Sequence, residues 1–393
     1  MTNVDRRRFL RLLMAAALTP PAACGPGGEY TADDAARLAR QREDERQRAG
    51  RLVFRGYRGL AELPWFELDP SGRLRLVAEI PPAFDVHAHL GIGVLLAPRV
   101  DLAKRSERVL HLLDCDATDP GCGLDLDVYI NGNFTEEALR DLEWELARQL
   151  VFGSHKARTH TVPNLLDEMD AVGVAKAALL PIAFGLPFRD DLTEQWRDAV
   201  EAAGAGGRLL TCASVHPRDP ERLTRLREFA ARGARAVKLH PAAQRFAASD
   251  AGALEIYAEC ERLGLPVFFH AGRAGIEPEA ALSYNLVRHL EVAVASFPRV
   301  RFALGHAGAR DVAEAIPLAR RHPNVWLDTH GQGVTQLAEL LESLGPERLL
   351  FGSDWPWYHL AASLAKVLIV TEGKPEARDA WLRGNAERFF ERG

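Results

Sequence analysis

Histidine, lysine and aspartate residues follow several short apolar runs of this chain, and together they could bind a divalent metal ion. The first run ends in His87 and His89, and His-x-His spacing directs both imidazoles to one face of a strand. Later runs end, in chain order, at Lys238, His240, His270, His306 and Asp354. Neutral imidazoles and carboxylates are the ligands that Zn²⁺ and related ions take in proteins. Because these residues lie far apart in the chain, only a fold that gathers many strand ends can bring them together.

A parallel barrel is such a fold, and the rest of the pattern supports it. Strands are expected at residues 83–86, 175–182, 208–215, 234–239, 266–270, 300–304, 324–328 and 348–352. Helical periodicity fills the gaps between them, as in residues 220–232, 253–263, 283–296 and 311–321. The alternation predicts an α/β fold, a (β/α)₈ TIM barrel, because parallel strands need crossover helices. The alternative is a doubly wound sheet, but His-x-His stands where that fold carries a glycine-rich phosphate loop.

The ordered set of polar residues resembles the amidohydrolase superfamily of metal-dependent barrel enzymes, and within it the amidohydrolase-related (amidohydrolase-2) branch. That family has His-x-His after strand one, a residue such as lysine after strand four, histidines after strands five and six, and aspartate after strand eight. The matching positions here are His87, His89, Lys238, His270, His306 and Asp354. Residues 167–174 and 384–389 also resemble family patterns, so the likeness covers about residues 80–391.

The resemblance implies a catalytic metal site. The expected ligands are His87, His89, His270 and Asp354, with one position left for water. A Zn²⁺-like ion lowers the pKa of its water towards about 7, and Asp354 could take the proton. His306 is expected either to act in catalysis or to bind a second ion. Lys238 could carry a carbamate that bridges two ions, or lie as a neutral or ion-paired lysine beside a single ion, and both alternatives stay open.

Three further residues are expected to contact the substrate. Arg273 could hold a substrate carboxylate with two parallel hydrogen bonds, His330 ends a strand on the same side as the ligands, and Trp355 follows Asp354 and could form a pocket wall.

The implied activity is hydrolysis of an amide, lactone or ester by metal-activated water. The first alternative is a metal-dependent, non-oxidative decarboxylase, because the amidohydrolase-2 branch includes carboxy-lyases with the same ligands. The second alternative is an exported binding protein that has lost catalysis.

Composition limits the class of partner. The chain has 393 residues, of which 47% are hydrophobic and 26% charged, and its formal net charge is −5. No basic stripe suggests nucleic acid, so a small molecule is the expected partner, and a homo-oligomer stays open.

The N-terminal residues are expected to form an export signal, followed by a region that leads into the barrel. Residues 1–24 resemble a twin-arginine export signal with Arg6 and Arg7, followed by a lipoprotein-type Cys24. A periplasmic or membrane-anchored protein is therefore expected, with a lipid on Cys24 as the membrane contact. Residues 25–79 are expected to form a linker, a charged solvated helix and a β-hairpin. The barrel should span residues 80–393, with residues 90–160 inserted after strand one as a lid. Within that insertion, Cys115 and Cys122 are either free or joined by a disulfide.

Overall fold

Eight parallel strands form a barrel in the computed structural model, which describes residues 30–116, 122–277 and 279–391. The barrel strands are β4 (Ala83–Ala88), β6 (Val174–Leu179), β7 (Leu209–Thr211), β8 (Val237–Leu239), β9 (Val267–Phe269), β10 (Phe302–Leu304), β11 (Val325–Asp328) and β12 (Leu349–Leu350). Parallel bridges between Ala213 and Val237, and between Ala88 and Trp355, join the three-stranded β4-β6-β7 sheet to the five-stranded remainder. The predicted TIM barrel is confirmed.

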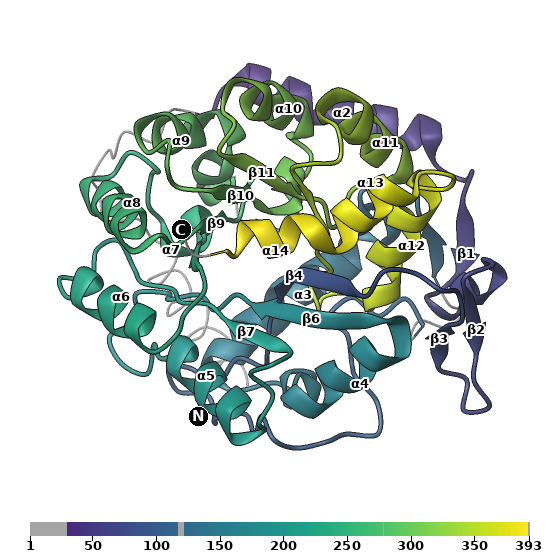
Figure 1. Cartoon of the computed structure of the whole chain (residues 1–393), viewed down its shortest axis with the longest axis horizontal. Coiled ribbons are helices and arrows are strands. Elements are labelled where there is room, and N and C mark those ends of the chain that lie inside the picture. Colours follow the sequence, from purple (N-terminus) through teal and green to yellow (C-terminus); the bar gives the residue numbers. More distant parts are fainter. Residues whose placement is uncertain (1–29, 117–121, 278, 392–393) are drawn as a thin grey trace, which may run out of the picture.

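Helices cover the outside of the barrel (Figure 1). They are α4 (Val162–Val172), α5 (Leu192–Ala202), α6 (Arg222–Ala231), α8 (Ala251–Leu263), α9 (Glu291–Ser296), α10 (Val312–Arg321), α11 (Val334–Leu344) and α12 (Leu360–Val370). Glycine allows some helices to turn directly into the next strand. Gly173, for example, ends α4 with φ 73°, and β6 begins at the next residue. Shorter turns are η1 (Arg58–Glu62), α7 (Pro241–Gln244), η4 (Glu279–Asn285), η5 (Val287–Leu290), η6 (Gly305–Gly308), α13 (Pro375–Asp379) and the π-turn η7 (Ala380–Gly384).

Aromatic residues close one end of the barrel. The short helix α14 (Asn385–Phe389) crosses the strands in Figure 1, and its Phe389 packs with Phe390 against Phe84 and Phe268. These rings belong to the cluster that fills the barrel interior, whose buried members are at most 4% exposed and against which the partly buried Leu210 and Trp326 pack. Because this end is filled, a ligand can reach the interior only from the other end, where the strands' carboxyl ends lie.

The N-terminal segments pack onto the barrel. Strands β2 (Phe66–Leu68) and β3 (Leu74–Leu76) form the predicted hairpin. The preceding helix α2 (Ala32–Arg48) differs from the expectation of a solvated helix, because its Asp34 and Glu45 are buried. Asp34 pairs with Arg288, and Glu45 lies 3.4 Å from the Nε of Arg310. The carboxylates of Asp34 and Glu45 therefore help to attach α2 to the barrel.

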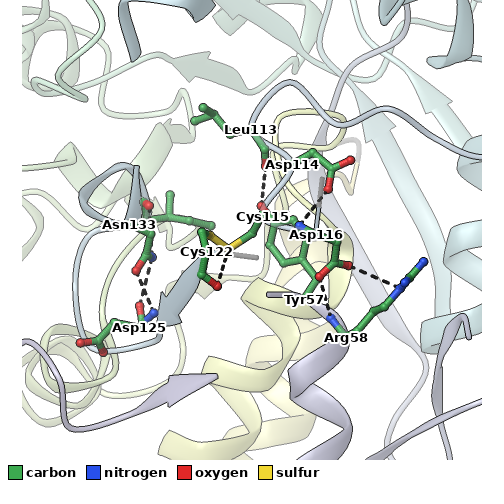
Figure 2. Close-up of a disulfide and its surroundings, with 10 residues drawn as sticks. Tyr57, Arg58, Leu113, Asp114, Cys115, Asp116, Cys122, Asp125 and Asn133 are labelled. Atoms are coloured by element: carbon green, nitrogen blue, oxygen red, sulfur yellow. Dashed lines mark hydrogen bonds and ion pairs between the residues drawn. A yellow bond between two sulfur atoms is a disulfide. The ribbon is translucent and has the colours of Figure 1, made fainter. Parts of the chain in front are cut away.

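The insertion after β4 contains β5 (Gly123–Asp125), η2 (Ile130–Asn133), α3 (Glu136–Val151) and η3 (Ala157–Thr159). Strand β5 pairs antiparallel with β1 (Val53–Arg55), so the insertion is tied to the N-terminal segment. Cys115 and Cys122 form a disulfide beside β5, which settles the choice left open by the sequence (Figure 2).

Leu112 and Leu113, shortly before the disulfide, connect the insertion to the catalytic end of the barrel. The backbone N–H groups of Leu112 and Leu113 donate to the carbonyls of Pro356 and Trp357. Tyr57 donates to the Leu113 carbonyl over 2.7 Å, as Figure 2 shows. The insertion is thereby held against the segment that follows Asp354. The expected export signal, including Arg6, Arg7 and Cys24, lies outside the described residues, and among the described helices none is long and apolar enough to cross a membrane.

Candidate metal centre

One cavity of about 380 Å³ lies at the open end of the barrel and collects the polar residues expected from the sequence. Those that line it are His87, His89, Lys238, His240, His270, His306 and Asp354. They come from the ends of β4, β8, β9 and β10 and from the loop after β12. Parallel strands of a barrel end on the same side, which brings residues so distant in the chain to one place.

One of three groups whose possible ligand atoms lie within 4.8 Å of one another consists of His87, His89 and Asp354, and each of these residues also lines the cavity. The Oδ1 atom of Asp354 is 3.2 Å from His89 Nε2 and 3.6 Å from His87 Nε2. Two imidazole nitrogens and a carboxylate oxygen that converge in this way fit a divalent transition metal. The structure thus brings together three of the four expected ligands.

Asp328 orients the first of these ligands. Its Oδ2 lies 2.6 Å from His87 Nδ1, and both side chains are buried. The Asp328 carboxylate accepts a hydrogen bond from the Nδ1–H group of His87, so the lone pair on His87 Nε2 is left facing Asp354. Carboxylate partners of this kind commonly fix the tautomer of metal-binding histidines. Asp328 was not among the residues expected from the sequence, although Asp328-x-His330 repeats the spacing of the first motif.

Asp85 positions the two segments that carry ligands. Its Oδ1 accepts from the backbone N–H of His87 over 3.0 Å and from that of Ser353 over 2.9 Å. Burial raises the pKa of Asp85 to about 7. Asp354, next to Ser353, has φ 59°, a left-handed conformation that costs energy for a residue with a Cβ. The surrounding hydrogen bonds maintain that conformation.

Lys238 points into the same space from β8. It is paired in register with Phe268, so both side chains face the barrel interior. Its Nζ lies 3.2 Å from His87 Nε2, and the residue is only 1% exposed. Desolvation lowers the pKa of Lys238 to about 8, although the negative charges of Asp354 and Asp328 oppose the shift. A sizeable fraction of this amine is therefore neutral near pH 8.

His270 and His306 form a second pair of nitrogen donors. His270 Nδ1 lies 3.0 Å from His306 Nε2, and His270 Nε2 lies 3.1 Å from a carboxylate oxygen of Glu277. His240 stacks on His270 at 3.9 Å between ring centroids. Ligands of a tetrahedral Zn²⁺ ion are about 3.3 Å apart, so this spacing suits either a hydrogen bond or two ligands of one ion. His270 does not belong to the group of His87, His89 and Asp354.

His330 lies behind Asp354, which corrects its expected role in substrate binding. Its Nδ1 is 3.0 Å from Asp328 Oδ2, and its Nε2 is 3.4 Å from Asp354 Oδ2. The residue is 2% exposed and does not line the cavity. Although burial alone would raise the pKa of Asp354, the positive charge of His330 and the contacts with His330 and His89 hold it well below its ordinary value. His330 therefore keeps Asp354 ionised.

Two other expected substrate contacts are also corrected. Arg273 turns away from the cavity, because its Nε binds Asp311 over 2.9 Å and its guanidinium donates to the carbonyl of Asp34 on α2 over 2.7 Å. A guanidinium engaged in this way cannot grip a substrate carboxylate. Trp355 is fully buried in the core, where its indole N–H donates to Glu168 over 3.2 Å. Its neighbour Trp357 lines the cavity in its place.

The remaining wall of the cavity is largely apolar. The insertion contributes Leu90, Ile92, Leu112, Leu146 and Leu150, and the barrel loops contribute Ile182, Phe184, Ile276, Trp357 and Tyr358. Arg245 adds a cation from the loop after β8, with a left-handed backbone at φ 52°. Burial also lowers the pKa of His87, His270 and His306, so these imidazoles are neutral near pH 7. The arrangement suits a small apolar molecule with an anionic group directed at the polar end.

Comparisons with known proteins agree with this arrangement. The Amidohydrolase family model Amidohydro_2 matches residues 161–392. No curated protein matches the chain.

Several solved structures share the fold. An uncharacterized TIM-barrel protein from Bordetella bronchiseptica is 20% identical with a TM-score of 0.55, and the match covers 78% of this chain and 98% of that one. A 5-carboxyvanillate decarboxylase from Novosphingobium aromaticivorans, complexed with manganese and 4-hydroxy-3-methoxy-5-nitrobenzoic acid, is 15% identical with a TM-score of 0.52, covering 78% and 98%. A 2,6-dihydroxybenzoate decarboxylase complexed with 2,6-dihydroxybenzoate is 19% identical with a TM-score of 0.51, covering 65% and 95%. At these identities the likeness establishes the fold.

Proposed function

Because the chain belongs to the Amidohydro_2 family of amidohydrolases, we propose that it is a metal-dependent decarboxylase of small aromatic carboxylic acids. The shape and polarity of the cavity carry this proposal. Its polar groups gather at the end where His87, His89 and Asp354 converge, and the rest of the wall is mainly aliphatic and aromatic. A volume of about 380 Å³ accommodates a single substituted ring. Two fold relatives whose structures hold small aromatic acids support the same choice.

The sequence favoured hydrolysis and gave decarboxylation as the alternative, and this proposal reverses that preference. The ordered ligands serve both reactions, so they do not distinguish them. Two solved structures that resemble the chain and hold small aromatic acids are decarboxylases, and this likeness supports decarboxylation over hydrolysis. Loss of catalysis is disfavoured by the intact convergence of His87, His89 and Asp354.

The residues of the cavity have distinct parts in the proposed reaction. A divalent ion held by His87, His89 and Asp354 would bind and orient the substrate carboxylate. The apolar wall holds the ring and excludes water, and Arg245 attracts a second anionic substituent. The bond between ring and carboxyl carbon then breaks, its electron pair stays on the ring carbon, and carbon dioxide leaves. The ring carbon takes a proton from the imidazolium form of His306, which lines the cavity at the end of β10 and returns to its neutral form.

The identity and number of ions are part of the proposal. Zn²⁺ suits nitrogen-rich ligands, whereas manganese is the ion bound by the Novosphingobium relative. One ion on His87, His89 and Asp354 is the simpler arrangement. A second ion would need the His270–His306 pair, with Lys238 as a bridging carbamate between the two sites.

Release of labelled carbon dioxide tests the reaction class. The purified protein, loaded with Mn²⁺ or with Zn²⁺, is incubated with carboxyl-¹³C hydroxybenzoates and, separately, with aryl esters, lactones and amides. Labelled carbon dioxide from wild type, abolished in Asp354→Asn and in His306→Asn, supports the decarboxylase. Hydrolysis of the second panel without carbon dioxide release replaces it with the hydrolase.

We also propose that the protein is exported by its twin-arginine-type N-terminus and anchored or released in the periplasm. The Cys115–Cys122 disulfide supports an oxidising compartment.

A further inference from the structure

Four side chains at the edge of the cavity form a hydrogen-bonded line. Glu277 is at one end, followed by His270 and His306, and Tyr129 from the insertion is at the other end. The Tyr129 hydroxyl lies 3.1 Å from His306 Nδ1. The two imidazoles are 3.0 Å apart, and His270 Nε2 lies 3.1 Å from Glu277.

The Glu277 end fixes the direction of every hydrogen bond in the line. Its carboxylate accepts from the backbone N–H groups of Ala274 and Gly275, each over 2.9 Å, so it is an acceptor. His270 must then donate from Nε2, and because a neutral imidazole has one N–H, its Nδ1 accepts. His306 in turn donates from Nε2 and accepts at Nδ1. The Tyr129 hydroxyl is the group that donates to it.

Tyr129 is held rigidly for this contact. It is 3% exposed, and the guanidinium carbon of Arg310 lies 5.0 Å from its ring centroid. Gly331 lies against the ring, where a Cβ would come within 2.9 Å of a ring carbon. The next residue, Ile130, donates its backbone N–H to the Gly331 carbonyl over 2.8 Å. The ring therefore has little freedom to move away from His306.

Arg310 connects this ring to the N-terminal helix. Its Nη1 donates to the carbonyl of Ala274 over 2.9 Å, and its Nε lies 3.4 Å from Glu45 on α2. Both Arg310 and Glu45 are less than 10% exposed. A buried guanidinium needs a paired carboxylate, so Glu45 determines where Arg310 rests. Helix α2 precedes the part of the chain that the family model matches.

We propose that Tyr129 is a positioning residue that fixes the tautomer and orientation of His306, and that α2 holds Tyr129 in place through Glu45 and Arg310. The inference concerns the metal-free protein and goes beyond the proposed reaction, since it holds for a decarboxylase and a hydrolase alike. It implies that a helix outside the matched family region helps to build the catalytic end of the barrel.

The test is nitrogen NMR of the full-length, metal-free protein labelled with ¹⁵N-histidine, with His306 assigned from a His306→Gln variant. Wild type should show His306 with a protonated Nε2 and an unprotonated Nδ1. Tyr129→Phe keeps the ring and removes the hydroxyl, so the ratio of the two His306 tautomers should fall about fivefold, the worth of one ordinary hydrogen bond. Glu45→Gln should shift the same ratio in the same direction by a smaller factor.

Two matched variants serve as controls. Tyr257→Phe removes a buried hydroxyl that has no hydrogen-bond partner among the described residues, and Asp44→Asn removes an exposed charge from α2. Both should leave the His306 signals unchanged. A protonated Nδ1 on His306 in wild type overturns the proposal without any variant, and so does an unchanged ratio in folded Tyr129→Phe. A response to Tyr129→Phe but none to Glu45→Gln overturns the role of α2.

Discussion

Replacing Asp328 with asparagine should weaken metal binding although Asp328 is not one of the expected ligands. The carboxylate lies 2.6 Å from His87 Nδ1 and 3.0 Å from His330 Nδ1, and it is fully buried. Asparagine keeps the shape but loses the charge and can turn an N–H group towards His87. The Nδ1–H tautomer of His87, which leaves Nε2 free for the ion, would then lose its stabilisation.

Loss of a carboxylate partner of a metal-binding histidine commonly reduces affinity about 10- to 100-fold, or about 1.4 to 2.7 kcal/mol of binding free energy. The loss of metal affinity in Asp328→Asn should lie within this range, because His87, one of the three converging ligands, depends on Asp328 for its orientation. Competition between the protein and a chelator for Zn²⁺ or Co²⁺ measures the dissociation constant directly. The gain in melting temperature on adding metal should shrink in parallel, because ligand stabilisation follows the dissociation constant.

Glu259→Gln is the matched control. It removes a buried carboxylate from α8 that pairs with Arg227 and Arg262 on the outside of the barrel. This variant should bind metal like wild type. An Asp328→Asn protein that folds and binds with wild-type affinity would show that Asp328 does not orient His87 and would refute the argument.

Three further predictions follow from other parts of the chain. If Lys238 carries a bridging carbamate, metal content measured with bicarbonate should fall from two equivalents to one in Lys238→Ala; one equivalent in both proteins excludes the bridge. Burial would raise the pKa of Glu168, but the positive charges of His359 and His111 lower it to about 2. The ionised Glu168 therefore stabilises the fold fully above about pH 4.5, and this contribution, at most about 3 kcal/mol, is lost as the pH falls towards 2. The free energy of unfolding, measured by urea titration, should therefore fall less steeply with acid in Glu168→Gln than in wild type. Changing Arg6 and Arg7 to lysine should leave the protein in the cytoplasm, and fractionation that finds it exported would contradict the twin-arginine route.

The barrel could be predicted from the sequence because each strand is an apolar run that ends in a recognisable residue. All eight expected strands occur, although most are shorter than the apolar runs from which they were predicted. The run at 208–215, for example, gives β7 only at Leu209–Thr211, and beyond it only the single bridge from Ala213 to Val237 continues the pairing. Strand ends also identified His87, His89 and Asp354, since a barrel places such ends together.

The direction of individual side chains could not be predicted, because it depends on partners far away in the chain. Arg273 follows a strand end just as His270 does, but Asp311 and the α2 backbone draw it outwards. Trp355 and Trp357 flank one proline, and only packing decides that the second of them faces the cavity. Tyr129 gave no signal in the sequence, because it belongs to an insertion with no regular pattern of its own.

In the part of the chain that the structure describes, Phe389 of α14 and Phe390 close the far end of the barrel, so the catalytic cavity is open at one end only. The ion, the substrate and the product must all pass the same rim, since Phe389 and Phe390 seal the far side. A ligand bound in the cavity then lies between the ion and the solvent. An aromatic acid that binds without reacting should therefore slow the escape of metal to a chelator, so occupancy of the chamber protects its own cofactor.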